Sequence, residues 1–364
     1  MSRHRLGLVL TGGTIGSTAA KDADVVQLVR ANPVAVMPGW LAGPLAAFGA
    51  HQLTIRLPVS LHSEEARPAD WTAIAGSCRT LADRGADAIC ILHGSDTMAY
   101  CAAALAFALS DLNIPIVLTG SNEPPDAPDS DARHNVRSAM IALRTLPAGV
   151  YVVFAGSEDG DALVHLGTRV RKERASGTAF VSPNGGPVAV VEGGRLKTLV
   201  PWSAPQPVVP LRTTAEFSPT VLELRVHPGL PFAALEPAVD SGGVRGVVAE
   251  LYPCATGPTG DDDASLARFA RYVTDRGGVV VGTVAAAPEL AGSYYPSLPT
   301  LTAAGVTFLP GVLSTAATVK LMWALARTDG DPDATRRLMR RPIAGEIALI
   351  GRKPVSSRRS QVKF

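Results

Sequence analysis

Short apolar segments that alternate with helical patterns are the feature that most constrains the fold of this chain. Segments rich in Val, Ile and Leu predict strands at 6–10, 53–57, 88–92, 114–118 and 150–155. Between them, apolar residues recur at helical spacing in 69–84, 97–109 and 131–145. Strands without apolar–polar alternation are typical of sheets buried on both faces. The pattern therefore predicts βαβ units around a parallel sheet.

A proline-dense stretch interrupts this rhythm near residue 200. Four of the ten residues in 201–210 are proline, which is typical of a linker. The α/β rhythm then resumes, with strands expected at 244–251 and 279–284 and helices at 264–276 and 314–327. We therefore predict a two-domain α/β protein with a basic tail. The predicted boundaries are 1–205 for the larger N-terminal domain, 206–218 for the linker, 219–341 for the smaller C-terminal α/β domain and 342–364 for the tail.

The composition excludes several classes of protein. Of the 364 residues, 46% are hydrophobic and 18% are charged, which excludes wholesale disorder. The formal net charge of +2 gives no case for a nucleic-acid or membrane partner. We expect no membrane span, because no run of ~20 apolar residues is present, and the N-terminus does not resemble a signal peptide. These features predict a cytoplasmic protein with reduced thiols.

The cysteines and histidines form no recognisable metal-site pattern. The four cysteines include no CxxC pair and the seven histidines include no HExxH, so we expect no metal. Three cysteines lie in apolar runs and are interpreted as small core residues: Cys78, Cys90 and Cys101.

Positive charge is concentrated at the C-terminal end of the sequence. Residues 336–364 carry nine Lys or Arg residues and a single acidic residue, Glu346. We interpret this segment as a solvated tail. The alternative hypothesis is that it binds an anionic partner.

The first candidate for chemistry is the turn Thr11-Gly12-Gly13-Thr14, directly after the first predicted strand. Paired glycines let a backbone bend sharply and leave N–H groups open to a ligand. The segment fits neither GxGxxG nor a P-loop, which disfavours a nucleotide site. A plain strand-to-helix turn is one interpretation, and a nucleophilic hydroxyl beside oxyanion donors is the other.

A second candidate turn, 93–98, follows the strand predicted at 88–92 and places Ser95 beside Asp96. Taken by itself, this turn is interpreted as a helix cap formed by Ser95 or Asp96. Active sites of open α/β sheets lie beyond the carboxyl ends of the strands, so both turns could face one site.

The basic run 168–174 is mostly expected to be solvated, but one lysine could lie beside Asp96 and take a proton from a hydroxyl. Ser63-Glu64-Glu65 could be a helix start or could hold charged groups of a substrate.

Together these motifs resemble the bacterial-type L-asparaginase family. Thr11–Ile15 matches the family's TGGTI signature, and 93–98 matches its HGTDT-type signature with Ser95 in place of threonine. Further agreement lies in 118–121, in Ser130, Asp131 and Asn135, and in the two segments 169–172 and 179–184. The resemblance covers most of 6–185 and is weaker beyond it.

The resemblance implies roles for individual residues. Thr14 would be the nucleophile, and Ser95, Asp96 and Lys172 would relay protons. Ser63 and Glu64 would hold the α-carboxylate and α-amino groups of the substrate, with Asp96 also touching the amine. The remaining implied substrate-binding residues are Gly13, Gly94 and Ser121.

The resemblance further implies a larger and a smaller α/β domain, a homodimer or homotetramer, and hydrolysis of L-asparagine to L-aspartate and ammonia with no metal or organic cofactor. A glutaminase-asparaginase differs by one methylene in the substrate, a difference worth only ~1–3 kcal/mol. The D-type component of the archaeal amidotransferase shares both signatures but has an extra N-terminal domain. Because the first strand is predicted to begin at residue 6, we expect an asparaginase rather than that amidotransferase component.

The chain departs from the family pattern in the segment after the first motif. The family places a tyrosine there to activate the nucleophile, whereas this chain has none in 15–50 and its first tyrosine is Tyr100. Ser17, Thr18 or Lys21 could take its place. The missing tyrosine motivates another hypothesis, a low-activity or non-catalytic sensor that binds an amino acid.

Overall fold

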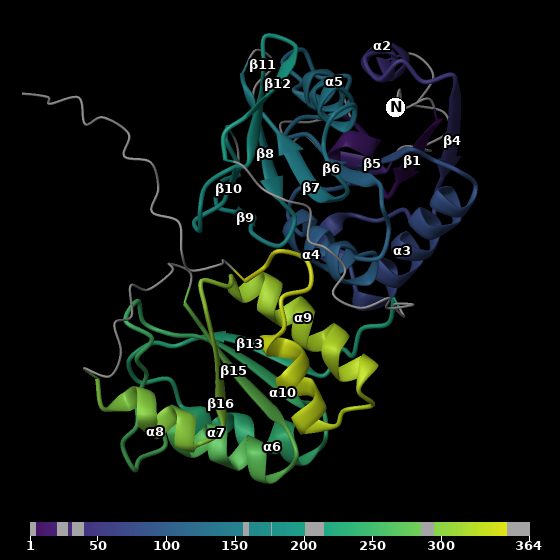
Figure 1. Cartoon of the computed structure of the whole chain (residues 1–364). Coiled ribbons are helices and arrows are strands. Elements are labelled where there is room, and N and C mark those ends of the chain that lie inside the picture. Colours follow the sequence, from purple (N-terminus) through teal and green to yellow (C-terminus); the bar gives the residue numbers. More distant parts are fainter. Residues whose placement is uncertain are drawn as a thin grey trace, which may run out of the picture.

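An eight-stranded sheet forms the centre of the larger domain in this computed structural model (Figure 1). The structure describes residues 5–19, 28–30, 40–155, 160–175, 177–200, 215–284 and 295–347. The strand order is β12-β11-β8-β7-β6-β5-β1-β4. Five of these strands are parallel, as the buried apolar segments predict: β1 (Arg5–Leu10), β4 (Gln52–Arg56), β5 (Ala88–Leu92), β6 (Pro115–Thr119) and β7 (Gly149–Phe154).

The other three strands of this sheet are antiparallel and extend the predicted parallel sheet at this edge. They are β8 (Ala162–Leu166), β11 (Ala189–Glu192) and β12 (Arg195–Thr198). The β7–β8 and β11–β12 connections are too short to hold a crossover helix, which parallel pairing requires.

Helices cover both faces of the large sheet. On one face, α5 (Ala132–Leu143) and the short α2 (Ala42–Ala46) pack on alternate side chains of the parallel strands. On the other face lie α3 (Pro68–Asp83) and α4 (Met98–Ala108). All residues of α4 except Tyr100 are buried, which is unusual for a helix that covers a sheet and shows that a further layer lies beyond it.

The further layer belongs to the smaller domain, which is built on a four-stranded parallel sheet of order β13-β14-β15-β16. Its strands are β13 (Val221–Arg225), β14 (Gly246–Glu250), β15 (Val279–Val284) and β16 (Val306–Pro310). One face packs on α6 (Glu236–Asp240), α7 (Leu266–Asp275), α8 (Ser297–Ala303) and the 3-10 turn η3 (Phe232–Leu235). The opposite face carries α9 (Ser314–Arg327) and α10 (Pro332–Arg340).

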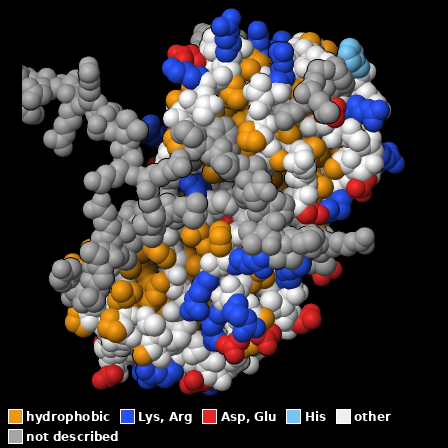
Figure 2. All heavy atoms as spheres, in the orientation of Figure 1, with side chains coloured by type: hydrophobic (Ala, Val, Ile, Leu, Met, Phe, Trp, Pro, Cys, Tyr) orange, Lys and Arg blue, Asp and Glu red, His pale blue; other side chains and the backbone are white. Residues whose placement is uncertain are grey.

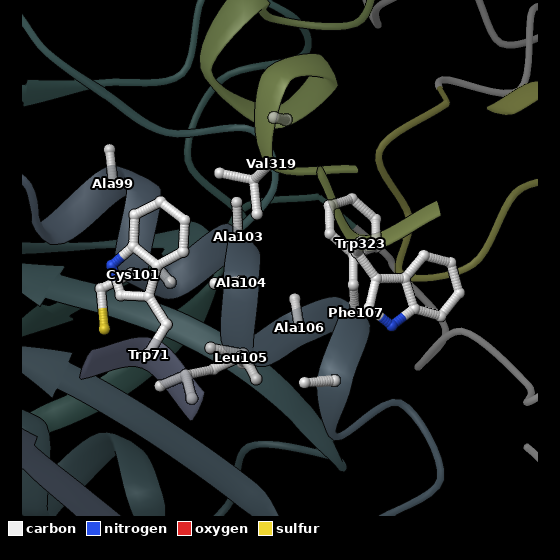
Figure 3. Close-up of a cluster of buried hydrophobic side chains, with 14 of the residues drawn as sticks. Trp71, Ala99, Cys101, Ala103, Ala104, Leu105, Ala106, Phe107, Val319 and Trp323 are labelled. Carbon is white, nitrogen blue, oxygen red and sulfur yellow. The ribbon is translucent and has the colours of Figure 1, made fainter. Parts of the chain in front are cut away.

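The two domains join where α4 meets α9 (Figure 3). Val319 and Trp323 of α9 lie against Ala103 and Phe107 of α4, and the rings of Phe107 and Trp323 stack with centroids 5.9 Å apart. Alanines on α4 let the helices approach closely, and burying each large apolar side chain contributes about 1.5–3 kcal/mol. The two domains therefore share one continuous hydrophobic core.

Described residues of the predicted linker and of the predicted tail are packed in the core. In the predicted linker, 206–214 lies outside the described residues, but Phe217 is buried edge-to-face against Trp71. In the predicted tail, Ile343 and Glu346 are buried, so the expectation of a solvated segment is wrong for 342–347. A hydrophobic side chain and a paired charge fix this part, and 348–364 lies outside the described residues. Figure 2 shows basic side chains beside acidic ones on the visible face of the smaller domain. In α10, Arg336 forms an ion pair with Asp333 (2.8 Å).

The remaining short elements include two two-stranded ribbons and two 3-10 turns. They are β2 (Ser17–Ala19) with β3 (Leu28–Arg30), β9 (Arg171–Lys172) with β10 (Phe180–Val181), η1 (Thr14–Gly16) and η2 (Ser63–Glu65). No helix of the described part is both long enough and apolar enough to cross a membrane.

Candidate active site

Three turns meet at the carboxyl edge of the parallel strands β4, β1 and β5. The turn after β1 pairs with the segment after β4: Gly13 N donates to Leu61 O (3.0 Å), and Leu61 N donates to Thr11 O (3.1 Å). Thr11 N donates to Leu92 O of β5 (3.1 Å). Backbone bonds therefore fix the position of the glycine-rich turn on both sides.

The turns at Gly13 and Gly94 are in direct contact. A methyl group added at Gly13 would lie 2.3 Å from the Gly94 Cα, and one added at Gly94 would lie 2.6 Å from the Ser63 hydroxyl. Gly13 also has a φ of +78°, a conformation that favours glycine. Glycine is needed at both positions, because any side chain would push the three turns apart.

Thr14 begins the 3-10 turn η1 and is partly exposed. Gly16 N and Ser17 Oγ both donate to Gly13 O, the latter at 2.8 Å, which closes the turn around Thr14. Among the described residues, no acceptor pairs with the backbone N–H of Thr14 or of Ser95. Two donors therefore lie on turns that touch each other, with a hydroxyl beside them.

Three residues were expected as substitutes for the missing tyrosine. The Ser17 hydroxyl is buried and bonds to the backbone of the Thr14 turn, so it serves to close that turn. Thr18 lies in β2, and Lys21 lies outside the described residues. The expectation of a substitute activating group at 18 or 21 therefore stays a prediction.

Lys172 lies against the second turn. Its Nζ donates to Ser95 Oγ (2.8 Å) and to Asp96 Oδ1 (2.6 Å). The lysine side chain is 16% exposed and the Asp96 side chain is 61% exposed, so the ion pair opens to solvent on the carboxylate side. Lys172 is placed there by the β9–β10 hairpin, where it pairs with Phe180.

The third turn carries Ser63 and Glu64 in η2. Ser63 is buried beside Gly94, and its carbonyl accepts a hydrogen bond from Thr97 Oγ1 (2.7 Å). Glu64 is exposed. Within the described residues, no hydrogen bond links the Thr14 hydroxyl or the Glu64 carboxylate to the other candidate side chains. The Thr14 hydroxyl and the Glu64 carboxylate are therefore placed in the site by the turns that carry them.

Ser121 follows β6 on the neighbouring turn. Its hydroxyl is buried and has no hydrogen-bond partner within the described residues. A methyl group added at Gly120 would lie 2.4 Å from the carbonyl oxygen of His93, so this turn is packed directly behind the Ser95 turn. A buried hydroxyl without a protein partner is rare, and such a group is suited to bind a polar ligand.

Asp131 and Asn135 form hydrogen bonds to the backbone on either side of Ser121. The Asp131 carboxylate accepts from Asn122 N (2.9 Å), and Asn135 Nδ2 donates to Gly120 O (3.0 Å). Both side chains are buried at the start of α5. The sequence analysis includes Asp131 and Asn135 in the family resemblance but assigns them no role in the site. The available signal was a pair of polar residues four positions apart on the first turn of an amphipathic helix.

Burial shifts the pKa of three titratable groups in the larger domain towards the uncharged form. Burial lowers the pKa of His93, which is fully enclosed and bonds through Nδ1 to Gly94 O. Burial raises the pKa of the Cys78 and Cys90 thiols to about 12, which matches their predicted role in the core. No group of His, Cys, Asp and Glu residues in the described part of the chain is arranged to hold a metal ion.

Comparison with known proteins identifies the family. Residues 5–203 match the family model "Asparaginase, N-terminal". The chain belongs to the asparaginase family. Its fold is that of solved L-asparaginases: the Thermococcus kodakarensis structure, 30% identical, superposes with a TM-score of 0.76 over 94% of this chain and 99% of that one. L-asparaginase I from Vibrio cholerae, 25% identical, gives the same TM-score over 96% of this chain and 100% of that one.

Among curated proteins, this asparaginase-family chain is similar to the D-type component of glutamyl-tRNA(Gln) amidotransferase. The Saccharolobus solfataricus protein is 33% identical over 95% of this chain and 77% of its own length. The Sulfolobus acidocaldarius protein is 32% identical over 94% of this chain and 75% of its own length. The comparisons therefore show membership of an amidohydrolase family.

Proposed function

We propose that this protein is an L-asparagine amidohydrolase that uses Thr14 as its nucleophile and releases L-aspartate and ammonia. The observation that carries the proposal is the contact between the Thr14 turn and the turn on which Lys172 bonds to Ser95 and Asp96. Thr14, a partly exposed residue, therefore lies on a turn that touches the turn of Ser95 and Asp96, the partners of Lys172. That is the arrangement covalent amide hydrolysis requires.

In the proposed mechanism, the Thr14 hydroxyl gives its proton to the Ser95–Asp96–Lys172 group as its oxygen attacks the side-chain amide carbon. The carbonyl oxygen becomes an oxyanion, which the N–H groups of Thr14 and Ser95 can stabilise. The Ser95–Asp96–Lys172 group delivers a proton to the amide nitrogen, the C–N bond breaks and ammonia leaves. Water then attacks the acyl-enzyme ester, and the Thr14 oxygen recovers its proton as aspartate departs.

Substrate recognition is assigned to the groups around these turns. Ser63 and Glu64 hold the α-carboxylate and α-amino groups, and Asp96, with its exposed carboxylate, also contacts the amine. Gly13 and Gly94 bind through their turns, and Ser121 contributes a buried hydroxyl that has no protein partner within the described residues. Every step uses groups of the chain itself, so the proposal includes no cofactor.

The test is ammonia release by the purified protein from L-asparagine, L-glutamine and D-asparagine, with Thr14→Ala as the inactive control and Thr14→Ser as the conservative one. We expect release from L-asparagine, its loss in Thr14→Ala and its partial retention in Thr14→Ser. Release from both amides at similar efficiency would favour a glutaminase-asparaginase. Binding of asparagine without release of ammonia would favour the amino-acid sensor and overturn the proposal.

A second candidate function is amide hydrolysis within an amidotransferase. It is favoured by the 33% identity to the D-type component of glutamyl-tRNA(Gln) amidotransferase over nearly the whole chain. In that case, the isolated protein would release little ammonia from free amino acids, and activity would depend on a partner protein. For the L-asparagine amidohydrolase, we propose a cytoplasmic location and a homodimer or homotetramer. Light scattering of the active protein would test the oligomeric state.

A further inference from the structure

A buried ion pair in the smaller domain lies at the start of a chain of contacts that leads to Lys172. Lys320 of α9 and Glu346, beyond α10, both have fully buried side chains and form an ion pair of 2.5 Å. Lys320 Nζ also donates to Met339 O (2.8 Å) and Arg341 O (2.6 Å). All three ammonium protons thus have acceptors, and replacing one member of such a pair would leave an uncompensated buried charge.

The Glu346 carboxylate shapes the turn that precedes it. Its oxygens accept hydrogen bonds from Ile343 N (3.0 Å) and Ala344 N (2.8 Å). Gly345, which follows them, has a φ of +78°, which closes the turn in a conformation that favours glycine. We call residues 343–347 the C-terminal turn. Its backbone is set by one side chain, which is anchored by Lys320.

The C-terminal turn presents carbonyl oxygens to the larger domain. Ala344 O accepts from Thr168 Oγ1 (3.0 Å), and Gly345 O accepts from Arg169 Nε (2.6 Å). Thr168 is 1% exposed, so its hydrogen bond is shielded from water. A buried hydroxyl that loses its acceptor costs more than the bond itself contributes, so the two segments are firmly joined.

Thr168 and Arg169 lead directly into the strand that carries Lys172. Val170 is buried in the shared core, and β9 begins at the next residue. The segment after β10, the other strand of the hairpin, is also attached to the smaller domain, because Asn184 Nδ2 donates to Gly311 O (2.5 Å). The hairpin is therefore held by the smaller domain at both of its ends, while the Lys172 amine contacts the larger domain's catalytic turn.

We propose that Glu346 and Thr168 are positioning residues for Lys172, so that the smaller domain sets where the lysine amine meets Ser95 and Asp96. The inference rests on the catalytic role proposed above for Lys172. It explains why a buried charge pair whose members are 26 residues apart in sequence fixes a tight turn that bonds to this hairpin. Neither residue is among those assigned above to bind the substrate.

The first test compares Thr168→Val, which keeps the side-chain shape and removes the hydroxyl, with Thr168→Ser, which keeps the hydroxyl. Thr335→Val is the matched control, because Thr335 is also fully buried and its hydroxyl donates to Asp331 O (2.7 Å) away from the hairpin. For Thr168→Val we expect kcat for asparagine to fall about 10- to 100-fold with KM unchanged, as a small misplacement of a catalytic group does. Thr168→Ser should restore kcat, and Thr335→Val should leave it unchanged. Equal kcat in Thr168→Val and the wild type would overturn the inference.

The second test needs no enzymatic activity and includes Glu346→Gln. Acetylation of Lys172 by acetic anhydride is followed by mass spectrometry, relative to Lys197, whose side chain is 69% exposed. In folded Thr168→Val and Glu346→Gln, Lys172 should react about fivefold faster, the change that loss of one hydrogen bond makes in a local opening equilibrium. An unchanged ratio in both variants would refute the positioning role. If the wild-type protein released no ammonia while the ratio rose, the proposed function would fail and the positioning of Lys172 would stand.

Discussion

The two halves of the candidate site are held in place by different means. The Thr14 half is fixed by backbone hydrogen bonds between Gly13 and Leu61 and by glycine-to-glycine contact with Gly94. The Lys172 half is fixed by side chains: the lysine bonds to Ser95 and Asp96, and its hairpin is attached to distant segments. In the Thr14 half, an atom added at Gly13 or Gly94 would collide with the neighbouring turn. In the Lys172 half, single side-chain hydrogen bonds can be removed one at a time. The comparison therefore predicts that substitutions in the two halves fail in different ways.

The largest effect is expected from Gly94→Ala. The new methyl group would lie 2.6 Å from both the Cβ and the Oγ of Ser63, so the three turns must separate. We expect loss of stability of about 1–3 kcal/mol from overpacking and loss of asparagine hydrolysis beyond what the folded fraction explains. Chemical denaturation and ammonia release measure the two quantities.

Gly76→Ala is the matched control, because this glycine lies in α3 and has nothing within 4 Å of the added methyl group. It should keep full activity and gain about 0.5–1 kcal/mol of stability, as expected for alanine in a helix. If Gly94→Ala kept wild-type turnover, the Thr14 half would not depend on the contact between its turns.

A smaller effect, confined to catalysis, is expected from Lys172→Met. Removing the amine should lower kcat about 10²- to 10⁴-fold, the usual contribution of a positioned proton-transfer group. Stability should hardly change, because the partner Asp96 is exposed and surface ion pairs contribute little. Lys197→Met removes an exposed lysine elsewhere and should leave kcat unchanged. A Lys172→Met enzyme as fast as the Lys197→Met enzyme would exclude Lys172 from the mechanism.

The same contrast explains how much of the fold could be predicted from sequence. Strands such as 88–92 and helices such as 314–327 match their predicted bounds because a continuous apolar run or a regular apolar stripe is a local property. The antiparallel β8, β11 and β12 could not be predicted as such, because pairing direction depends on which strands meet and not on their composition. The packing of 343–347 depends on Lys320, a single buried charge in a helix.

The candidate site divides along the same line. The Thr11–Thr14 and 93–97 turns contain glycines next to hydroxyl and carboxyl side chains, a pattern that is visible in a short stretch of sequence. The structure brings these two turns into contact. Asp131, Asn135, Thr168 and Glu346 act through bonds to carbonyls and N–H groups, most of them on other segments of the chain. Apart from the four-residue spacing of Asp131 and Asn135, polar residues that satisfy backbone groups in this way leave no local pattern, so their part in the site could not be predicted.

The Lys172 half should also weaken in acid, because His165 supports it. His165 Nδ1 bonds to Ser182 Oγ (2.8 Å), directly after β10, and burial lowers the pKa of this histidine to about 4. The unfolded chain binds the proton at higher pH than the folded chain does, so stability falls as pH decreases from about 6.5 towards 4, by about 3 kcal/mol in total. Urea denaturation at pH 7 and pH 4.5 measures this. In His165→Asn the difference should shrink, and an unaltered difference would assign the acid sensitivity to other groups.

The smallest effect is expected from Ser95→Thr, which restores the residue that is usual in the family signature. The added methyl group restricts χ1, whereas serine can occupy three staggered rotamers. If only one rotamer accepts the bond from Lys172 Nζ, the restriction can raise kcat by about threefold at most.

A double-mutant cycle with Lys172→Met decides whether that gain passes through the lysine. Because the two side chains are 2.8 Å apart, their effects should be coupled, and the gain from Ser95→Thr should disappear when the amine is absent. A gain that persists in the Lys172→Met background would mean that the methyl group acts on the Ser95 turn itself. In that case Ser95 belongs with the Thr14 half of the site, and the boundary between the two halves runs between Ser95 and Lys172.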